Sequence, residues 1–403
     1  MEKEKNKERI PQLRFPEFKN APAWEQRKLG EVAEIVGGGT PSTSNPEYWD
    51  GDIDWYAPAE IGEKTFVSES KRKISKLGLE KSSAKLLPVG TVLFTSRAGI
   101  GNTAILAKSA TTNQGFQSIV PKENLLYSYF IYSMTGYLKH YGEVTGAGST
   151  FVEVSGKQMA KCPISLPSLP EQTAIGDFFS TLDRSIALHQ RELENLKNRK
   201  KSLLQKMFPK NGESVPKIRF PEFKNAPAWE QRKLGEVAEI TMGQSPNSAK
   251  YTNNPSDHIL VQGNADMRNG YVHPRVWTTQ VTKTAKKGAL IISVRAPVGD
   301  VGKTEYNVVL GRGVAAIQGN EFIFQLLSKM KINGYWEKLS TGSTFESINS
   351  NDLKDASISL PSLPEQTAIG DFFSTLDRSI ALHQRKLEHL KLRKKALLQK
   401  MFP

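Results

Sequence analysis

The sequence predicts an α+β protein made of two similar domains, joined by two long helices that form an antiparallel coiled coil. Two repeats carry this prediction. Residues 166–209 return as 360–403 with four substitutions, and both copies space apolar residues alternately four and three apart. Residues 14–35 return without change as 219–240. Repeated segments therefore bracket two unrepeated ones, which indicates an internal duplication whose halves are related by a pseudo-two-fold axis.

The stretches 166–209 and 360–403 are predicted to be helices with a heptad seam, because the 4-3 spacing keeps apolar side chains on one face. Polar residues interrupt the seam at His189, Lys200, His383 and Lys394. We expect the isolated histidines to set the register, and no metal site is predicted. The apolar seam, expected to pair the helices and support partner docking, comprises Ile175, Phe179, Leu182, Ile186, Leu193, Leu196, Leu203, Ile369, Phe373, Leu376, Ile380, Leu387, Leu390 and Leu397.

Local signals mark where these helices begin and end. Ser168 with Glu171, and Ser362 with Glu365, have the spacing of a capping box. Basic runs at 197–201 and 391–395 suit the negative end of a helix dipole, and also suit contact with a duplex or an acidic partner.

The unrepeated regions, about 36–163 and 241–357, differ in sequence but share a skeleton. Each has a glycine turn, a short apolar strand and Arg-Ala, at 90–98 and 288–296. Short apolar strands between Gly and Pro turns predict one compact α+β fold for both regions. The predicted division is a first domain at 1–165, a helix at 166–209, a linker at 210–218, a second domain at 219–359 and a helix at 360–403.

Composition narrows the class of protein. The 403 residues carry a formal net charge of +14, which favours a polyanionic partner, although a solvated basic surface is the alternative. The lone cysteine, Cys162, excludes an internal disulfide framework and fits a reducing compartment. Neither a signal peptide nor an 18-residue apolar run is present, so we expect a cytoplasmic protein that does not enter membranes.

The order of these segments resembles the specificity subunit of type I restriction-modification enzymes. The resemblance rests on the RFPEF…W…KLGE block at 14–31 and 219–236, on the LP-x-x-x-EQ…L-D-x-x-I helix at 166–186 and 360–380, and on the two variable regions between them. It implies that each variable region is a target-recognition domain reading half of a bipartite DNA site. It also implies that the helices set the spacer between half-sites and dock methyltransferase subunits.

The same resemblance implies the partners and cofactors. The expected partners are double-stranded DNA, two methyltransferase subunits and the restriction/translocase subunits. The chain itself is expected to bind no cofactor and to catalyse nothing, with S-adenosylmethionine, ATP and Mg²⁺ on the partner subunits.

DNA recognition needs side chains that hold phosphates and side chains that meet base edges. Turns that follow predicted strands offer candidates for the phosphates, with a purely structural role in the turn as the alternative. The phosphate candidates are Arg97, Asn102, Thr103, Ser149, Thr150, Arg295, Lys303, Thr304, Ser343 and Thr344. Candidates for sequence readout, each with ordinary surface as the alternative, are Asn113, Gln114, Gln117, the 71–73 cluster, Gln244, Asn247, Gln262, Asn264, Arg268, Asn269, Arg275 and Arg312.

Other functions are weaker hypotheses. An adenine methyltransferase would carry an N-P-P-aromatic loop, and Asn45-Pro46-Glu47-Tyr48 lacks the second proline. The aromatic cluster Tyr48, Trp49, Trp55 and Tyr56 is interpreted as core rather than as a base-stacking platform, and Trp24 and Trp229 as packing residues. A coiled-coil scaffold that never touches DNA is the remaining alternative.

Overall fold

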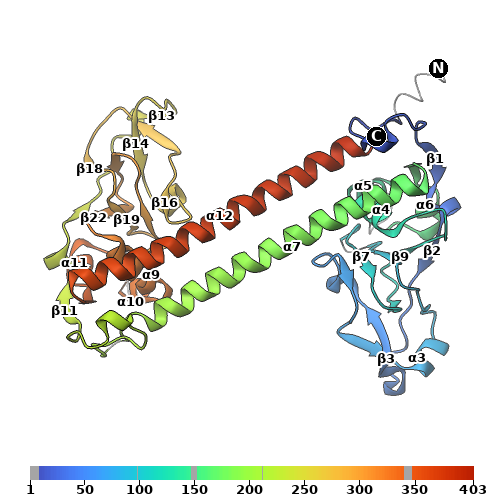
Figure 1. The fold of residues 1–403 in the computed structure, drawn as a ribbon, viewed down its shortest axis with the longest axis horizontal. Helices are drawn as coiled ribbons and strands as arrows, with labels where there is room; N and C mark the ends of the chain where they lie inside the picture. Colours follow the sequence, from blue (N-terminus) through green and yellow to red (C-terminus); the bar gives the residue numbers. More distant parts are fainter. Residues whose placement is uncertain (1–8, 98, 147–151, 211, 340–346) are drawn as a thin grey trace. The chain divides into compact units, whose positions relative to one another are not determined.

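The computed structural model describes residues 9–97, 99–146, 152–210, 212–339 and 347–403 (Figure 1). The chain divides into two compact units. Unit 1 comprises Met1–His189 with Leu387–Pro403, and unit 2 comprises Gln190–Lys386. The long helices α7 (Leu169–Lys206) and α12 (Leu363–Met401) therefore each contribute to both units.

Unit 1 is built on a five-stranded sheet of order β2-β9-β6-β7-β4. Its central strands are apolar on both faces; every residue of β6 and β7 is buried, which explains their near-continuous hydrophobic runs. Val92 of β6 pairs with Ile105 of β7 and with Ile119 of β9. The strands are β2 (Ala33–Gly37), β4 (Phe66–Val67), β6 (Val92–Phe94), β7 (Thr103–Leu106) and β9 (Gln117–Pro121).

Unit 1 also contains a three-stranded sheet of order β5-β3-β8, with β3 at Trp49–Tyr56, β5 at Arg72–Ile74 and β8 at Thr111–Thr112. Trp49 and Trp55 pack edge to face at 5.2 Å between ring centroids. Trp49, Trp55 and Tyr56 are all buried, which confirms the interpretation of these aromatic residues as core.

Short helices cover the main sheet of unit 1: α2 (Leu29–Val32), α4 (Ser128–Ser133), α5 (Thr135–Gly146) and α6 (Gly156–Ala160), while α3 (Lys76–Glu80) packs against β3. A two-stranded ribbon, β1 (Glu25–Lys28) with β10 (Pro163–Leu166), leads the chain into α7.

Unit 2 repeats this plan with more strands. A six-stranded sheet has the order β12-β22-β19-β20-β16-β15, and a five-stranded sheet has the order β13-β17-β14-β21-β18. The first sheet contains β12 (Ile240–Met242), β15 (Met267–Arg268), β16 (Tyr271–Val272), β19 (Leu290–Ser293), β20 (Val301–Lys303) and β22 (Val314–Ile317). The second contains β13 (Tyr251–Thr252), β14 (His258–Val261), β17 (Val276–Thr278), β18 (Lys283–Ala285) and β21 (Val308–Leu310).

Helices α8 (Leu234–Val237), α9 (Glu321–Ile332), α10 (Tyr335–Leu339) and α11 (Ser350–Lys354) complete unit 2, and the ribbon β11 (Glu230–Lys233) with β23 (Ser357–Leu360) leads into α12. Both ribbons have the same register: Glu25 faces Leu166 as Glu230 faces Leu360. The expectation of one fold for both halves is therefore confirmed at the level of strand pairing.

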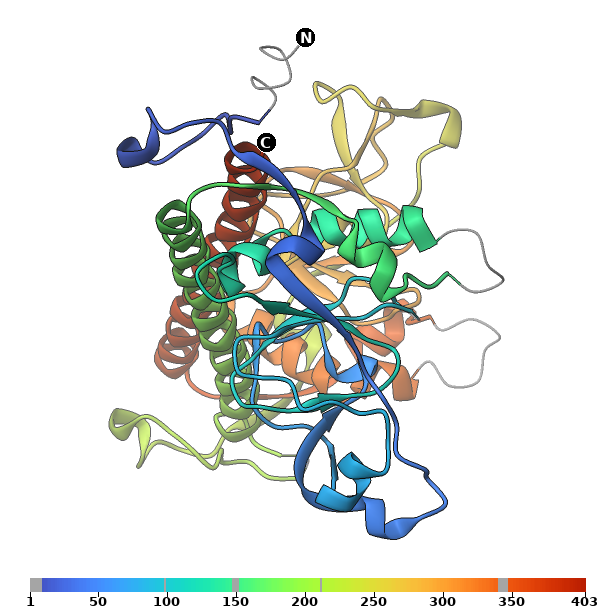
Figure 2. The same cartoon turned by 90° about the vertical axis from the view of Figure 1, so that its right-hand side faces the viewer.

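Within unit 1, the start of α7 packs antiparallel to the end of α12, which runs along the same flank of the unit (Figure 2). Phe402 lies against Phe179 and against Trp24, at 6.2 and 5.8 Å between ring centroids. Asp183 binds Lys394 at 2.6 Å. From Phe179 to Asp183 the residue numbers rise along α7, while those of the partners fall from Phe402 to Lys394. The two helices are therefore antiparallel, as the sequence predicts.

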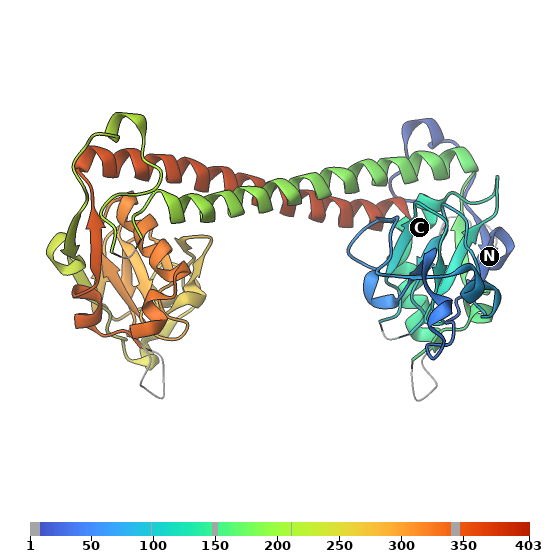
Figure 3. The ribbon, with the colours of Figure 1, turned by 90° about the horizontal axis from the view of Figure 1, so that it is seen from below.

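Unit 2 contains the equivalent arrangement, with the end of α7 beside the start of α12 (Figure 3). Phe208 lies against Phe373 and Trp229, at 6.1 and 5.9 Å, and Lys200 binds Asp377 at 2.6 Å. Seam residues nearest the helix starts, Ile175, Phe179, Ile369 and Phe373, are at most 2% exposed and belong to the cores of the units. The seam therefore serves as domain core as well as coiled coil.

One local prediction is wrong. Glu171 accepts hydrogen bonds from Nε and Nη2 of Arg14, both at 2.6 Å, and from Nε1 of Trp24 at 3.3 Å. Glu365 has the same three contacts with Arg219 and Trp229. These glutamates are thus held by an arginine far away in sequence, rather than closing capping boxes, and they attach the repeated block to the helix start.

Among the helices that the structure describes, none is both long enough and apolar enough to cross a membrane.

Candidate nucleic-acid interface

The turn that follows β6 in unit 1 is closed by a hydroxyl side chain. Oγ1 of Thr95 donates to the carbonyl of Gly99 at 2.7 Å and accepts from the backbone N–H of Asn102 at 2.9 Å. The Thr95 N–H also donates to the Asn102 carbonyl at 3.0 Å. These bonds fix the turn without using the Asn102 side chain, which is exposed.

The turn after β19 in unit 2 is built in the same way. Oγ of Ser293 donates to the Pro297 carbonyl and accepts from the Asp300 N–H, both at 2.9 Å. Each partner lies 198 positions after its counterpart in unit 1, so Asp300 is the structural equivalent of Asn102. Both units therefore present one polar side chain from the same place in a rigid turn.

The predicted arginines occupy these turns. Arg97 forms an isolated antiparallel bridge with Glu153, and Arg295 forms one with Ser347. Arg295 is exposed and Arg97 is half-buried. Their backbone is thus tied to a neighbouring segment, and within the part of the chain that the structure describes neither guanidinium has an ion-pair partner. A positioning contact to phosphate stays a prediction for both arginines.

Two phosphate candidates are corrected because they lie in the core. Thr103 is 6% exposed and its hydroxyl lies 2.9 Å from that of Thr135. Thr304 is 2% exposed and its hydroxyl donates to the Tyr306 carbonyl. Thr103 begins β7, which is buried along its whole length, and Thr304 directly follows β20, so neither buried hydroxyl reaches a duplex.

Lys303 is a poor phosphate contact for a different reason. Its Nζ lies 2.8 Å from a carboxylate oxygen of Glu321 and 4.6 Å from the ring centroid of Phe324. The strand register also aligns Lys303 with Ile105 of unit 1, not with the Asn102 turn. The charge of Lys303 is therefore balanced inside unit 2.

A second loop lies beside each turn. In unit 1 the Gly115 carbonyl accepts from the Ser96 N–H at 2.8 Å, and in unit 2 the Gly313 carbonyl accepts from the Val294 N–H at 2.9 Å. The exposed residues at the tips of these loops are Gln114 and Arg312. Asn113 does not face outwards freely, because its Oδ1 accepts from the Gly115 N–H at 2.7 Å.

Glycines let a third segment approach these loops. A Cβ on Gly38 would lie 1.9 Å from the Asn113 carbonyl oxygen, and one on Gly243 would lie 2.0 Å from that of Gly311. No other residue fits such an approach without moving the backbone. Gln244, which follows Gly243, is exposed, and its N–H donates to the Leu310 carbonyl at 2.9 Å.

Other candidates have varied surroundings. Arg268 is exposed on β15, and the side chain of Asn264 donates to Asp300 at 3.4 Å, beside the turn. Asn247 caps a short 3-10 helix, Ser248–Lys250. Ser149, Thr150, Ser343 and Thr344 lie outside the described residues.

The basic cluster 71–73 is partly structural. The guanidinium carbon of Arg72 lies 3.7 Å from the Trp49 ring centroid, a cation–π contact. Lys73 lies 3.8 Å from the carboxylate of Asp54, which is 1% exposed. Burial alone would raise the pKa of Asp54, but hydrogen bonds from the Ser70 N–H and hydroxyl, together with Lys108 and Lys73, lower it overall.

The enzyme-like motif has a structural role. Oδ1 of Asn45 accepts from the Glu47 N–H at 3.1 Å and caps the short 3-10 helix Pro46–Tyr48. The asparagine side chain is therefore used locally, where a methyltransferase would need it to bind a target base.

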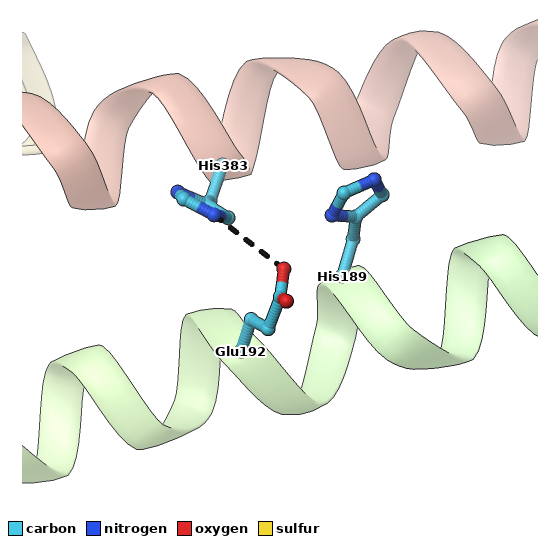
Figure 4. Close-up of side chains that lie close together, drawn as sticks. All are labelled: His189, Glu192 and His383. Carbon is cyan, nitrogen blue, oxygen red and sulfur yellow. Dashed lines mark ion pairs between the residues drawn. The ribbon is translucent and has the colours of Figure 1, made fainter.

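The polar seam positions find partners within each unit. The sequence predicted Lys200 and Lys394 as polar seam positions but not their acceptors. Lys200 binds Asp377, which also accepts a hydrogen bond from Gln325. Lys394 binds Asp183, which also accepts a hydrogen bond from Tyr129. In unit 2, Nε2 of His383 lies 3.5 Å from a carboxylate oxygen of Glu192 (Figure 4). His383 is therefore not isolated, contrary to the prediction.

The paired turns and loops define a protein that presents the same rigid surface twice with different exposed side chains. The family model for the type I restriction modification DNA specificity domain matches residues 22–198 and 227–392. The chain therefore belongs to the type I restriction modification DNA specificity family.

Similar proteins that are already known support this family assignment. The chain is 29% identical to the type I restriction enzyme MjaX specificity subunit of Methanocaldococcus jannaschii, over 93% of this chain and 92% of that protein. It is 33% identical to the MjaIX specificity subunit of the same organism, over 55% of this chain and 53% of that one. The scaffold and methyltransferase hypotheses receive no support from these matches.

Two solved structures share the fold. The S subunit of a type I restriction-modification system from M. genitalium matches with a TM-score of 0.67 at 15% identity, over 98% of this chain and 99% of that one. A chain from a study of complex assembly and conformational transition of the type I system matches with a TM-score of 0.56 at 24% identity, over 94% and 97% of the two chains.

Proposed function

We propose that this chain selects the DNA target of a type I restriction-modification complex, with unit 1 reading one half-site and unit 2 the other. The observation that carries the proposal is the pair of equivalent turns, fixed by Thr95 and Ser293, with the loops beside them, which present different exposed side chains, Gln114 and Arg312, from one backbone arrangement. A protein that recognises two short DNA sequences needs such a surface. Phosphate contacts position the protein on the DNA, whereas base contacts that differ between the units specify the two sequences.

The proposal includes the rest of the complex. Helices α7 and α12 set the length of the unread spacer and dock two methyltransferase subunits, whose near-identical sites are supplied by the near-identity of 166–209 and 360–403. Restriction/translocase subunits complete the complex. S-adenosylmethionine, ATP and Mg²⁺ belong to those partners, this chain contributes no catalytic group, and the complex acts on DNA in the cytoplasm.

The test is to express the chain with and without its methyltransferase partner and to map every methylated base in the host genome. A split motif that is methylated only when both proteins are present is the expected result. Methylation by this chain alone would make it an enzyme, and methylation that is unchanged when this chain is omitted would remove it from target selection.

A further inference from the structure

The loops at 112–116 and 310–314 present one exposed side chain each from an equivalent position. The Gly115 and Gly313 carbonyls accept from the Ser96 and Val294 N–H groups, so residue 114 corresponds to residue 312. Unit 1 has Gln114 there and unit 2 has Arg312. The position thus changes from neutral to charged between two otherwise matching loops.

The backbone around Arg312 is fixed on several sides. The Arg312 N–H donates to Oγ of Ser245 at 3.1 Å, and the Gly311 N–H donates to the Val261 carbonyl at 2.7 Å. A Cβ on Gly313 would lie 2.1 Å from the Gln262 carbonyl oxygen, so the loop lies flat against the end of β14. The Arg312 side chain therefore projects from a rigid base, as direct reading of a base edge requires.

The loop in unit 1 is fixed comparably, and a neighbour orients its side chain. The Asn113 N–H donates to the Tyr56 carbonyl at 3.0 Å. The Thr40 hydroxyl donates to Oε1 of Gln114. In this orientation of the amide, Oε1 keeps a second lone pair and Nε2 carries two N–H donors.

The guanidinium of Arg312 has different surroundings from the amide of Gln114. Among the residues that the structure describes, no acidic group forms an ion pair with it, and Arg312 is exposed. The hydroxyl of Ser245, equivalent to that of Thr40, is used by the Arg312 backbone instead. Gln114 thus offers one donor and one acceptor side by side, and Arg312 offers only donors.

We infer that position 114/312 reads one base pair in each half-site through the major groove, with Gln114 selecting adenine and Arg312 selecting guanine. An amide pairs its acceptor and donor with N6 and N7 of adenine, and an arginine fork donates to O6 and N7 of guanine. This inference rests on the proposed function, because it requires that both units bind DNA.

The neighbouring arginines separate this role from phosphate binding. Phosphate is the same in every sequence, so a phosphate contact is best served by the same residue in both units. Arg97 and Arg295 meet that condition and position 114/312 does not. The constant arginines therefore suit contacts to the DNA backbone, and the variable position suits contact with a base.

The experiment uses the full chain co-expressed with its methyltransferase partner and reads the methylated motif from the host genome. Arg312→Gln is expected to change one position of one half-site from guanine to adenine, or to relax it. Gln114→Arg is expected to change one position of the other half-site towards guanine. Preference for the original base should fall roughly tenfold to a hundredfold.

Two further variants distinguish base reading from phosphate binding and from the loss of any surface charge. Arg312→Lys keeps the charge but loses the fork, so it is expected to relax the same position, whereas a phosphate contact would leave the motif unchanged. Lys286→Gln removes one exposed charge elsewhere in unit 2 and should leave the motif as it is. Purified complexes tested on duplexes carrying each of the four base pairs at that position provide the same comparison as affinities.

The outcomes separate the inference from the proposed function. If the unsubstituted chain directs a split motif and both Gln114→Arg and Arg312→Gln retain it with weaker methylation, the inference is overturned and the loops contact phosphate. If the unsubstituted chain with its partner directs no split motif, the proposed function fails first and the inference falls with it.

Discussion

At the scale of single residues, the candidate interface depends on glycines that let backbone segments touch. A Cβ on Gly243 would lie 2.0 Å from the Gly311 carbonyl oxygen, beside the Arg312 loop. We expect Gly243→Ala to displace this loop, to lower the free energy of unfolding by about 1–3 kcal/mol or more, and to weaken recognition by unit 2. Chemical denaturation and duplex binding measure the two effects.

Gly263→Ala is the matched control for this prediction. Gly263 lies in unit 2 in extended backbone, and a Cβ there would meet nothing within 4 Å. Its unfolding curve should overlay that of the unsubstituted chain. A loss of stability from Gly263→Ala as large as that from Gly243→Ala would show that close approach is not the cause.

Buried charge is the second feature at this scale. Arg14 and Glu171 have 7% and 1% of their side chains exposed and are paired at 2.6 Å. Glu171→Gln leaves the guanidinium without its charge partner, so we expect it to lower the free energy of unfolding by about 3–5 kcal/mol. Thermal and urea unfolding check this. Glu17→Gln, at an exposed position of the same repeated block, should change stability by no more than about 0.5 kcal/mol.

The sequence predicted the positions of residues in the fold where a short pattern determines them. The Arg97 and Arg295 positions were found because a glycine, an apolar strand and Arg-Ala recur in both halves. Thr103 and Thr304 were misplaced because a hydroxyl can be buried when it has an internal partner, here Thr135 and the Tyr306 carbonyl, and the sequence does not show those partners. The role of Glu171 was missed because its partner, Arg14, is distant in sequence and local capping spacing gave a competing explanation.

At the scale of elements, inter-helix ion pairs fix how α7 and α12 pack inside each unit. Lys394 and Asp183 lie 2.6 Å apart with 27% and 13% of their side chains exposed. A double-mutant cycle with Lys394→Ala and Asp183→Ala is expected to give a coupling energy of about 0.5–3 kcal/mol. Stability of the four proteins to denaturant measures it. Lys395→Ala, at an exposed neighbour, should show no coupling with Asp183→Ala.

The three-stranded sheet of unit 1 carries a pH dependence through Asp54. An unfolded aspartate has a pKa of about 3.9, and the folded pKa is lower because hydrogen bonds from Ser70 and the nearby lysines outweigh burial. A lowered folded pKa stabilises the protein above the unfolded value. This stabilisation is lost as the pH falls through the folded pKa.

Asp54→Asn tests this directly. We expect the variant to be less stable than the unsubstituted chain near neutral pH, and the difference to shrink as the pH falls below about 4. Unfolding measured across pH 3–7 provides the comparison. Asp52→Asn, at an exposed position of the same strand, should give a difference that does not vary with pH in this way.

Helices and strands could be predicted where a periodic pattern of apolar residues extends over many residues. Helices expected at 166–209 and 360–403 are found at Leu169–Lys206 and Leu363–Met401. The acceptors for the seam lysines were not predicted, because Asp183 and Asp377 lie one position beyond the apolar seam and look like ordinary surface residues. The small strands of unit 2, such as β15 and β16, are too short to carry a periodic signal.

At the scale of the whole molecule, duplication is the property that sequence reveals most directly, since near-identity over 44 residues needs no structural interpretation. What duplication cannot reveal is which residues complete each core. Phe402 packs in unit 1 with Trp24, and Phe208 packs in unit 2 with Trp229. Each compact unit thus takes the end of a helix that began in the other unit, and both helices are needed for either core.

This shared dependence makes helix length the variable to test at the molecular scale. Adding one heptad after Gln190 in α7 and after Gln384 in α12 lengthens both helices while keeping the Asp183–Lys394 and Lys200–Asp377 pairs in register. Seven residues add about 10.5 Å to a helix, which corresponds to roughly three base pairs of duplex. If the helices set the spacer, the methylated motif should keep both half-sites and gain about three unread base pairs between them.

The control is an insertion of four residues at the same two places, which breaks the heptad seam and should lower methylation instead of shifting the spacer. Genome-wide mapping of methylated bases distinguishes the outcomes. An unchanged spacer in a stable heptad-insertion variant would mean that the unread distance is fixed by the bound partners or by the DNA. The helices would then serve to complete the two cores and to dock the partners, without measuring length.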